Sequence, residues 1–128
     1  MYAKVLKVVG VQGTSHYIVC KHFVAPAGEE IFAVLGEDRV LYVPIDSNVG
    51  KEYAVRIVKK TAWNIKKIKV GKVKTSAVYF IPKPFAKTLN IKKGDLVLVL
   101  GHDSSLEVIP IKVVVEKLGK FREPLLSS

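Results

Sequence analysis

Two segments of this chain repeat one another, and this repeat constrains the fold more than any other sequence feature. The stretch GEEIFAVLGEDRVLYVPI, residues Gly28 to Ile45, matches GDLVLVLGHDSSLEVIPI, residues Gly94 to Ile111. The stretch VGVQGTSHYIVCKHF, from Val9 to Phe23, matches VGKVKTSAVYFIPKPF, from Val70 to Phe85, with one gap. We interpret the chain as two tandem copies of one small unit, a degenerate copy over residues 1–58 and a better preserved copy over residues 62–118. Units of about 50 residues bury too little surface to fold alone, so we expect both copies to share one core in a single domain over residues 1–128.

The composition favours strands. Hydrophobic residues make up 49% of the chain, and aromatic residues only 9%. Val, Ile and Leu make up most of the other hydrophobic residues, as is typical of packed strands. The apolar pattern predicts strands over residues 3–11, 16–24, 30–35, 39–43, 53–58, 65–73, 78–81, 96–100, 106–111 and 113–115. The fold class is therefore predicted to be mostly β.

One short helix is predicted in the second copy. Pro84 suits the first turn of a helix, and Asn90 suits the left-handed residue that ends one. The first copy has four fewer residues between its Phe and its Gly, Phe23 to Gly28 against Phe85 to Gly94, so we expect a turn there in place of the helix.

Positive charge is concentrated in the middle of the chain. The chain carries 21 Lys and Arg against 11 Asp and Glu, a formal net charge of +10. Residues 51–93 hold 13 of the basic residues and one acid, Glu52, which leaves 8 basic and 10 acidic residues elsewhere. A lysine-rich stretch can be no more than a solvated surface. This degree of segregation favours a polyanionic partner instead.

Lysines in the second copy are the candidate nucleic-acid contacts. They lie on the predicted strand over residues 65–73, around the predicted helix and at the turn that follows it. The candidate set is Lys66, Lys67, Lys69, Lys72, Lys74, Lys83, Lys87 and Lys92. Lysine predominates over arginine, which favours contact with the phosphate backbone over bidentate reading of bases. We hypothesise a basic rim on which duplex DNA lies. The role of Trp63 stays open between stacking on a base and packing between the copies.

An ordered series of short motifs runs through the second copy: Ile81-Pro82, Leu89-Asn90-Ile91, Lys93-Gly94-Asp95 and Ile109-Pro110. Over about 45 residues this series resembles the AbrB/SpoVT family of swapped-hairpin DNA-binding domains, which includes the MazE type. In that family two chains exchange hairpins to build one dimeric barrel.

The resemblance implies that two fused copies form a pseudo-two-fold β-barrel of AbrB-like units within one chain. It also implies DNA contacts at Lys72, Lys74 and Lys87. The chain departs from the family at Val78, where members usually carry an arginine. The same unit also resembles half of a double-psi barrel, so that strand pairing stays open as an alternative.

No residue pattern in the sequence predicts catalysis. The three histidines show no metal-ligand spacing, and His102-Asp103-Ser104 is expected to be a hairpin turn, since adjacent residues cannot adopt the geometry of a catalytic triad. We therefore expect no enzyme activity, no catalytic residue, no metal and no cofactor. The single cysteine, Cys20, excludes an intrachain disulfide and is expected to be a buried apolar residue.

The function that the sequence predicts is binding of double-stranded DNA in the cytoplasm, as a transcriptional regulator or a nucleoid-associated protein. The alternative is a protein-interaction barrel, antitoxin-like or an adaptor, with an acidic protein as its partner. Whether the chain forms a homo-oligomer stays open. The sequence contains no run of about 18 uncharged apolar residues, so no association with a membrane is expected.

Overall fold

The structure is a computed structural model, and it describes residues 2–10, 16–45 and 64–126. Within these ranges most residues outside the C-terminal helix lie in strands, which confirms a mostly β fold. The strands are β1 (Tyr2–Lys7), β2 (Val9–Gly10), β3 (His16–Cys20), β4 (Glu30–Leu35), β5 (Val40–Pro44), β6 (Ile65–Lys69), β7 (Gly71–Val73), β8 (Ser76–Ile81), β9 (Leu96–His102) and β10 (Ser105–Pro110). The helices are α2 (Lys83–Leu89) and α3 (Ile111–Leu126). The predicted strand over residues 53–58 and Trp63 lie outside the described residues.

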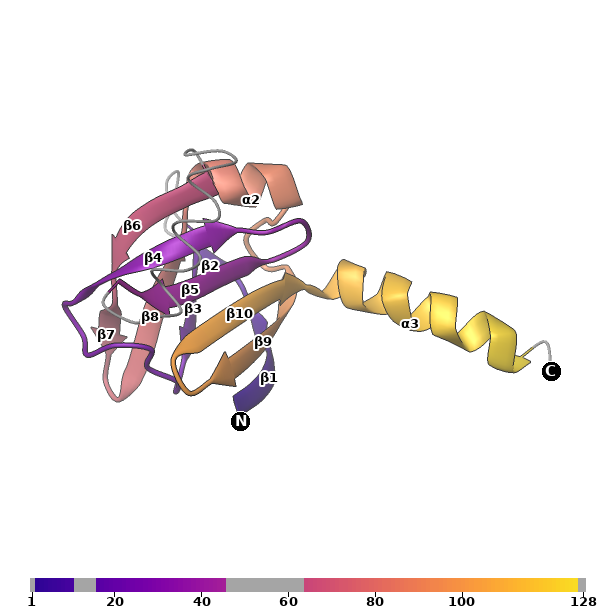
Figure 1. The fold of residues 1–128 in the computed structure, drawn as a ribbon, viewed down its shortest axis with the longest axis horizontal. Coiled ribbons are helices and arrows are strands. Elements are labelled where there is room, and N and C mark those ends of the chain that lie inside the picture. The colour runs from indigo at the N-terminus through magenta and orange to yellow at the C-terminus, as the bar shows by residue number, and fades with distance from the viewer. Residues whose placement is uncertain (1, 11–15, 46–63, 127–128) are drawn as a thin grey trace.

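Among the described residues the strands form two antiparallel sheets. One has six strands in the order β1-β9-β10-β5-β4-β6, and the other has four in the order β2-β3-β8-β7. Figure 1 shows both sheets, with α2 at the top of the view and α3 projecting away from the strands. In this part of the chain both sheets are open, so a closed barrel is not confirmed.

The two halves of the sequence exchange strands in the larger sheet. Strand β1 pairs with β9 over all six of its residues, from Tyr2 opposite Gly101 to Lys7 opposite Leu96. Strand β6 pairs in the same antiparallel manner with β4. Each half therefore supplies an outer strand to the hairpin of the other half.

A buried valine lies at each corner where the chain passes from one sheet to the other. Val8 separates β1 from β2, and its N–H and carbonyl bond to Asp95 and Gly94, both at 2.8 Å. Val70 separates β6 from β7, with its N–H 3.0 Å from the carbonyl of Glu29 and its carbonyl 2.8 Å from the N–H of Gly28. The predicted single strands over residues 3–11 and 65–73 are wrong for this reason. The chain turns at Val8 and at Val70, and two strands result in each place.

Two buried tyrosines connect the sheets. The hydroxyl of Tyr42 on β5 donates to the carbonyl of Phe80 on β8 at 3.0 Å. The hydroxyl of Tyr79 donates to the carbonyl of His22 at 2.6 Å and accepts the N–H of Val24 at 3.0 Å. The two rings lie 5.2 Å apart, and burial raises the pKa of both phenols. The side chains of Tyr79 and Phe80 point to opposite faces of β8, so Tyr79 is buried and Phe80 is 40% exposed.

The expected helix in the second copy is present as α2. Pro84 lies in its first turn, where the missing N–H costs no hydrogen bond. Asn90 ends the helix at φ 54° and ψ 47°, in the predicted left-handed conformation. Between Phe23 and Gly28 the structure has turns and no helix, as expected. Cys20 is buried, at 3% exposure, which also agrees with its prediction.

The predicted strand over Val113–Val115 is wrong, because these residues lie in α3. Three consecutive β-branched residues favour a strand locally. Here apolar residues at Ile111, Val114, Val115 and Leu118 follow the helical period instead. Strand β10 already has a neighbouring strand on each side, β9 on one side and β5 on the other.

Replacing Tyr79 by Phe is expected to lower the free energy of unfolding by about 1–3 kcal/mol, because the N–H of Val24 and the carbonyl of His22 would lose their buried partner. Urea unfolding at neutral pH measures this change. Tyr17→Phe is the matched control. Tyr17 is half-buried, its ring lies 5.6 Å from that of Phe80 at an angle of 53°, and its hydroxyl forms no hydrogen bond among the described residues. Equal losses in the two variants would contradict the role given to Tyr79.

Candidate nucleic-acid interface

Five of the predicted lysines lie along one continuous segment that forms an edge of each sheet. Strand β6 is the outer strand of the six-stranded sheet, and β7 is the outer strand of the four-stranded sheet. The edge lysines are Lys66, Lys67, Lys69, Lys72 and Lys74, and all five are exposed. Figure 1 shows β6 and β7 following one another along the left side of the molecule.

The other three predicted lysines surround α2, and we call them the helix lysines. Lys83 and Lys87 lie four residues apart, so both occupy the same side of the helix. Phe85, Ala86 and Leu89 occupy the buried side. Lys92 lies in the turn after the helix, where its backbone N–H donates to the carboxylate of Asp95 at 2.8 Å. Asp95 therefore stabilises the turn that follows α2.

The edge lysines near the β7–β8 turn and the helix lysines lie at opposite ends of β8. The chain runs from Lys74 through β8 to Lys83, and at about 3.3 Å per strand residue this path spans roughly 20–25 Å. Successive phosphates along one DNA strand are about 3.4 Å apart, so about seven nucleotides cover the same distance. The lysines therefore form an elongated arrangement and not one compact patch.

These eight lysines form no ion pair in the described part of the chain. The salt bridges found there use two carboxylates, Asp38 and Glu107, which pair with cations outside the candidate set. Glu30 lies directly opposite Lys69 across the β4–β6 pair without forming a salt bridge. The positive charge of the exposed ammonium groups is therefore available to an external anion. It is least available at Lys69, which lies opposite Glu30.

An ionic network joins the β4–β5 turn, the last hairpin and α3. Arg39 contacts Asp38 at 2.8 Å and Glu107 at 2.9 Å. His102 reaches the second oxygen of Glu107 at 3.0 Å, and Lys117 of α3 reaches the second oxygen of Asp38 at 2.8 Å. Nothing in the sequence predicted this network, because Arg39 and Glu107 lie 68 residues apart. His102 is the last residue of β9, and the predicted hairpin turn is formed by Asp103 and Ser104.

The network changes the protonation of its carboxylates. Hydrogen bonds from Arg39 and then from Lys117 lower the pKa of Asp38 to about 2. Partial burial raises the pKa of Glu107, but hydrogen bonds from His102 and Arg39 outweigh this effect and lower it overall. Both carboxylates are therefore charged at neutral pH.

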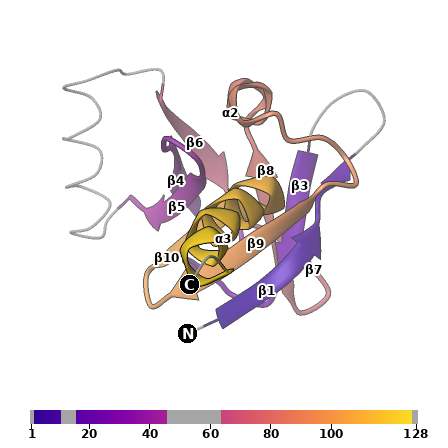
Figure 2. The ribbon, with the colours of Figure 1, turned by 90° about the vertical axis from the view of Figure 1, so that its right-hand side faces the viewer.

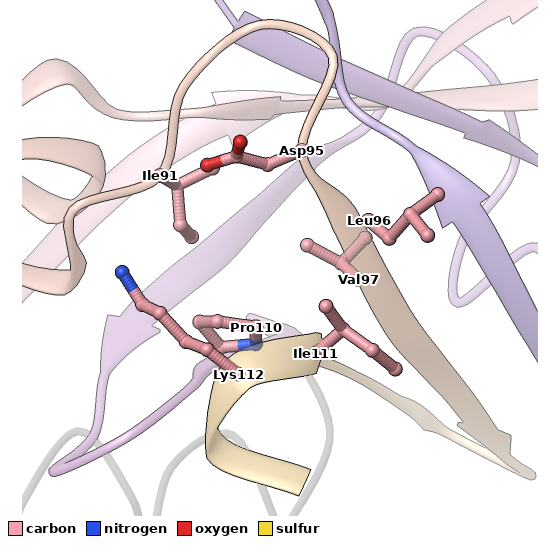
Figure 3. A pocket seen from close by; sticks show the side chains of 7 residues that line it. All are labelled: Ile91, Asp95, Leu96, Val97, Pro110, Ile111 and Lys112. Atoms are coloured by element: carbon pink, nitrogen blue, oxygen red, sulfur yellow. The ribbon is translucent and has the colours of Figure 1, made fainter. Parts of the chain in front are cut away.

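A small hollow lies where α3 begins, as Figure 3 shows. Its volume is about 140 Å³, and it is lined by Ile91, Asp95, Leu96, Val97, Pro110, Ile111 and Lys112. Its two charged groups are already engaged, since Asp95 accepts the N–H of Lys92 and the ammonium of Lys112 donates to the carbonyl of Asn90 at 2.9 Å. Pockets for small molecules usually hold about 300–1,000 Å³. The hollow is thus too small for a typical organic ligand.

The described residues contain no group of three or more His, Cys, Asp or Glu placed to hold a metal ion. In the same part of the chain, no helix has the length and apolar character needed to cross a membrane.

Comparisons with known proteins add no relative: no family model, no curated protein and no solved structure matches this chain.

Acidification is expected to destabilise the fold in part through Asp38. A carboxyl whose pKa is lower in the folded chain stabilises the fold above its unfolded pKa of about 3.9, and this contribution is lost as the pH falls toward 2. The free energy of unfolding should therefore fall more between pH 4 and pH 2 in the wild type than in Asp38→Asn. Urea unfolding at stepped pH measures both profiles. Asp103→Asn, at an exposed aspartate with no ion pair among the described residues, should keep the wild-type profile. Parallel profiles for wild type and Asp38→Asn would contradict this assignment.

Proposed function

We propose that this chain binds double-stranded DNA through the edge lysines and the helix lysines, as a cytoplasmic transcriptional regulator or nucleoid-associated protein without enzyme activity. The observation that carries the proposal is the array of eight exposed lysines without ion-pair partners in the described chain. If the lysines served only to keep this surface solvated, acidic residues would be expected among them. Residues 64–93 of the sequence contain no acidic residue.

The chemistry of the set favours contact with the phosphate backbone. Each lysine is a point charge on a flexible stem, which suits phosphate oxygens more than the edges of bases. Since all eight lie on strands, a short helix and tight turns, most of their backbone positions are held in place before DNA arrives. We therefore propose binding with modest sequence specificity.

The strand exchange supports the AbrB/SpoVT-like interpretation of the fold. β1 pairs with the second-half hairpin, and β6 pairs with the first-half hairpin. This is the pairing expected if two hairpin-exchanging units are fused in one chain. The matching corners at Val8 and Val70 further support a pseudo-two-fold arrangement of two copies around one core. We accordingly favour swapped-hairpin pairing over the double-psi alternative.

The test compares two double variants that change the net charge equally. Lys72→Glu with Lys87→Glu alters one edge lysine and one helix lysine. Lys4→Glu with Lys7→Glu alters two exposed lysines of β1 outside the set. Fluorescence anisotropy with a 25-base-pair duplex should show affinity reduced by about 10- to 100-fold in the first variant and by less than about threefold in the second.

Circular dichroism and thermal melting check that both variants stay folded. Equal losses in the two variants would show that net charge alone attracts DNA, and would overturn the site. Retained binding in the first variant would do the same.

A further inference from the structure

The turn between β7 and β8 holds a lysine in a backbone conformation that lysine rarely adopts. Val73 and Ser76 pair directly across the two strands, so Lys74 and Thr75 alone form the turn. Lys74 has a φ angle of 55°. The favoured two-residue turns between antiparallel strands require positive φ at their first central position, which Gly, Asn and Asp adopt at the least cost. In lysine the Cβ atom then lies too close to the following carbonyl oxygen.

Elsewhere the described chain follows the usual residue preference at positive φ. Apart from glycines, Asn90 is the other described residue with positive φ, at 54°, and asparagine tolerates this conformation at the end of a helix. Glycine or asparagine at position 74 would suit the turn better than lysine does. The stability of the fold therefore does not account for Lys74. Unfavourable backbone conformations that a chain retains are concentrated at functional sites.

The surroundings of Lys74 leave its side chain free to contact DNA. Residues 72–75 are all exposed, and β7 is the outermost strand of the four-stranded sheet among the described residues. Neither Lys72 nor Lys74 forms an ion pair in that part of the chain. The turn lies at the opposite end of β8 from α2, as Figure 1 shows. The hairpin thus ends in a narrow tip with positive charge.

The dimensions of this tip match one groove of DNA. Paired strands lie about 4.8 Å apart. The major groove is about 12 Å wide and admits a two-stranded ribbon, whereas the minor groove is only about 6 Å wide. In the major groove guanine presents two neighbouring acceptors, N7 and O6, and a lysine ammonium carries three donors and no acceptor. Lysine is therefore suited to guanine in this groove.

We propose that the β7–β8 turn enters the major groove of the bound duplex, where the ammonium of Lys74 donates hydrogen bonds to guanine. This inference rests on the proposed binding of DNA and adds one base contact to it. The other seven candidate lysines keep the phosphate contacts already proposed. Lys74 is then the position at which the chain gives up stability of the fold for recognition of DNA.

Two duplexes of the same sequence test the base contact. One 25-base-pair duplex contains guanine, and the other contains 7-deazaguanine, which lacks the N7 acceptor and leaves the phosphates and the minor groove unchanged. In fluorescence anisotropy at about 50 mM NaCl, the wild type should bind the guanine duplex at least about fivefold more tightly. Lys74→Gly should bind the two duplexes equally, because it has no ammonium to donate.

Lys72→Gln and Lys87→Gln are the matched controls, because each removes one positive charge from the candidate set, as Lys74→Gly does. Both should bind more weakly than the wild type and keep its preference for guanine. Equal affinity of the wild type for the two duplexes would overturn the inference and leave the proposed function standing. A guanine preference retained in Lys74→Gly, or lost in both controls, would do the same. No binding of the wild type to either duplex would overturn both.

Unfolding in urea gives a second and independent measurement. Lys74→Gly should raise the urea midpoint, because glycine adopts a φ of 55° without the steric conflict of a Cβ. Asn90→Gly, at a φ of 54°, should change the midpoint less and should keep the guanine preference, since asparagine already tolerates this conformation. A lower midpoint in Lys74→Gly would show that the lysine stabilises the fold, and would contradict the role given to its side chain.

Discussion

The reciprocal pairing of β1 with β9 and of β6 with β4 is the interaction on which the rest of this structure depends. Each hairpin would have an unpaired edge without the strand from the other half of the sequence. The chain passes from this exchange into the smaller sheet at the corner valines, Val8 and Val70. Each valine forms two backbone hydrogen bonds to the residues just before the hairpin of the other half. Their partners include Gly28 at φ 91° and Gly94 at φ 89°, a left-handed conformation that glycine adopts at little cost. The two halves thus hold each other in place.

This arrangement also determines where the lysines lie. The segment over residues 65–74 forms the outer strand of both sheets, so its lysine side chains face solvent. Lysine on an exposed edge discourages pairing with the edge of another molecule. The same charges, unpaired by acids, are suited to a polyanion. Under the proposed function one set of residues protects the edges and binds DNA, and the two roles make no conflicting demands on the sequence.

Local patterns predicted the local structure well. Alternating apolar residues predicted the hairpins, and β4 has the predicted bounds; Pro84 and Asn90 predicted where α2 begins and ends. The errors lie where tertiary contacts determine the secondary structure. Val70 ends β6 because the backbone around Gly28 bonds to it, and the run Val113–Val115 is helical although its residues favour strands. The candidate lysines could be selected from the sequence, because an uneven distribution of charge along the chain is visible without knowledge of the fold. The network around Arg39 and Glu107 was missed because its partners are distant in the chain and adjacent only in the folded sheet.

The salt dependence of DNA affinity tests the central claim most directly, because it counts the phosphates that lysines neutralise. If five of the eight candidate lysines contact phosphates, the logarithm of the association constant should fall with the logarithm of salt concentration at a slope of about −4 to −5. Anisotropy titrations of a labelled duplex between about 50 and 300 mM NaCl measure this slope. A slope shallower than about −1, or no binding at 50 mM salt, would contradict the account.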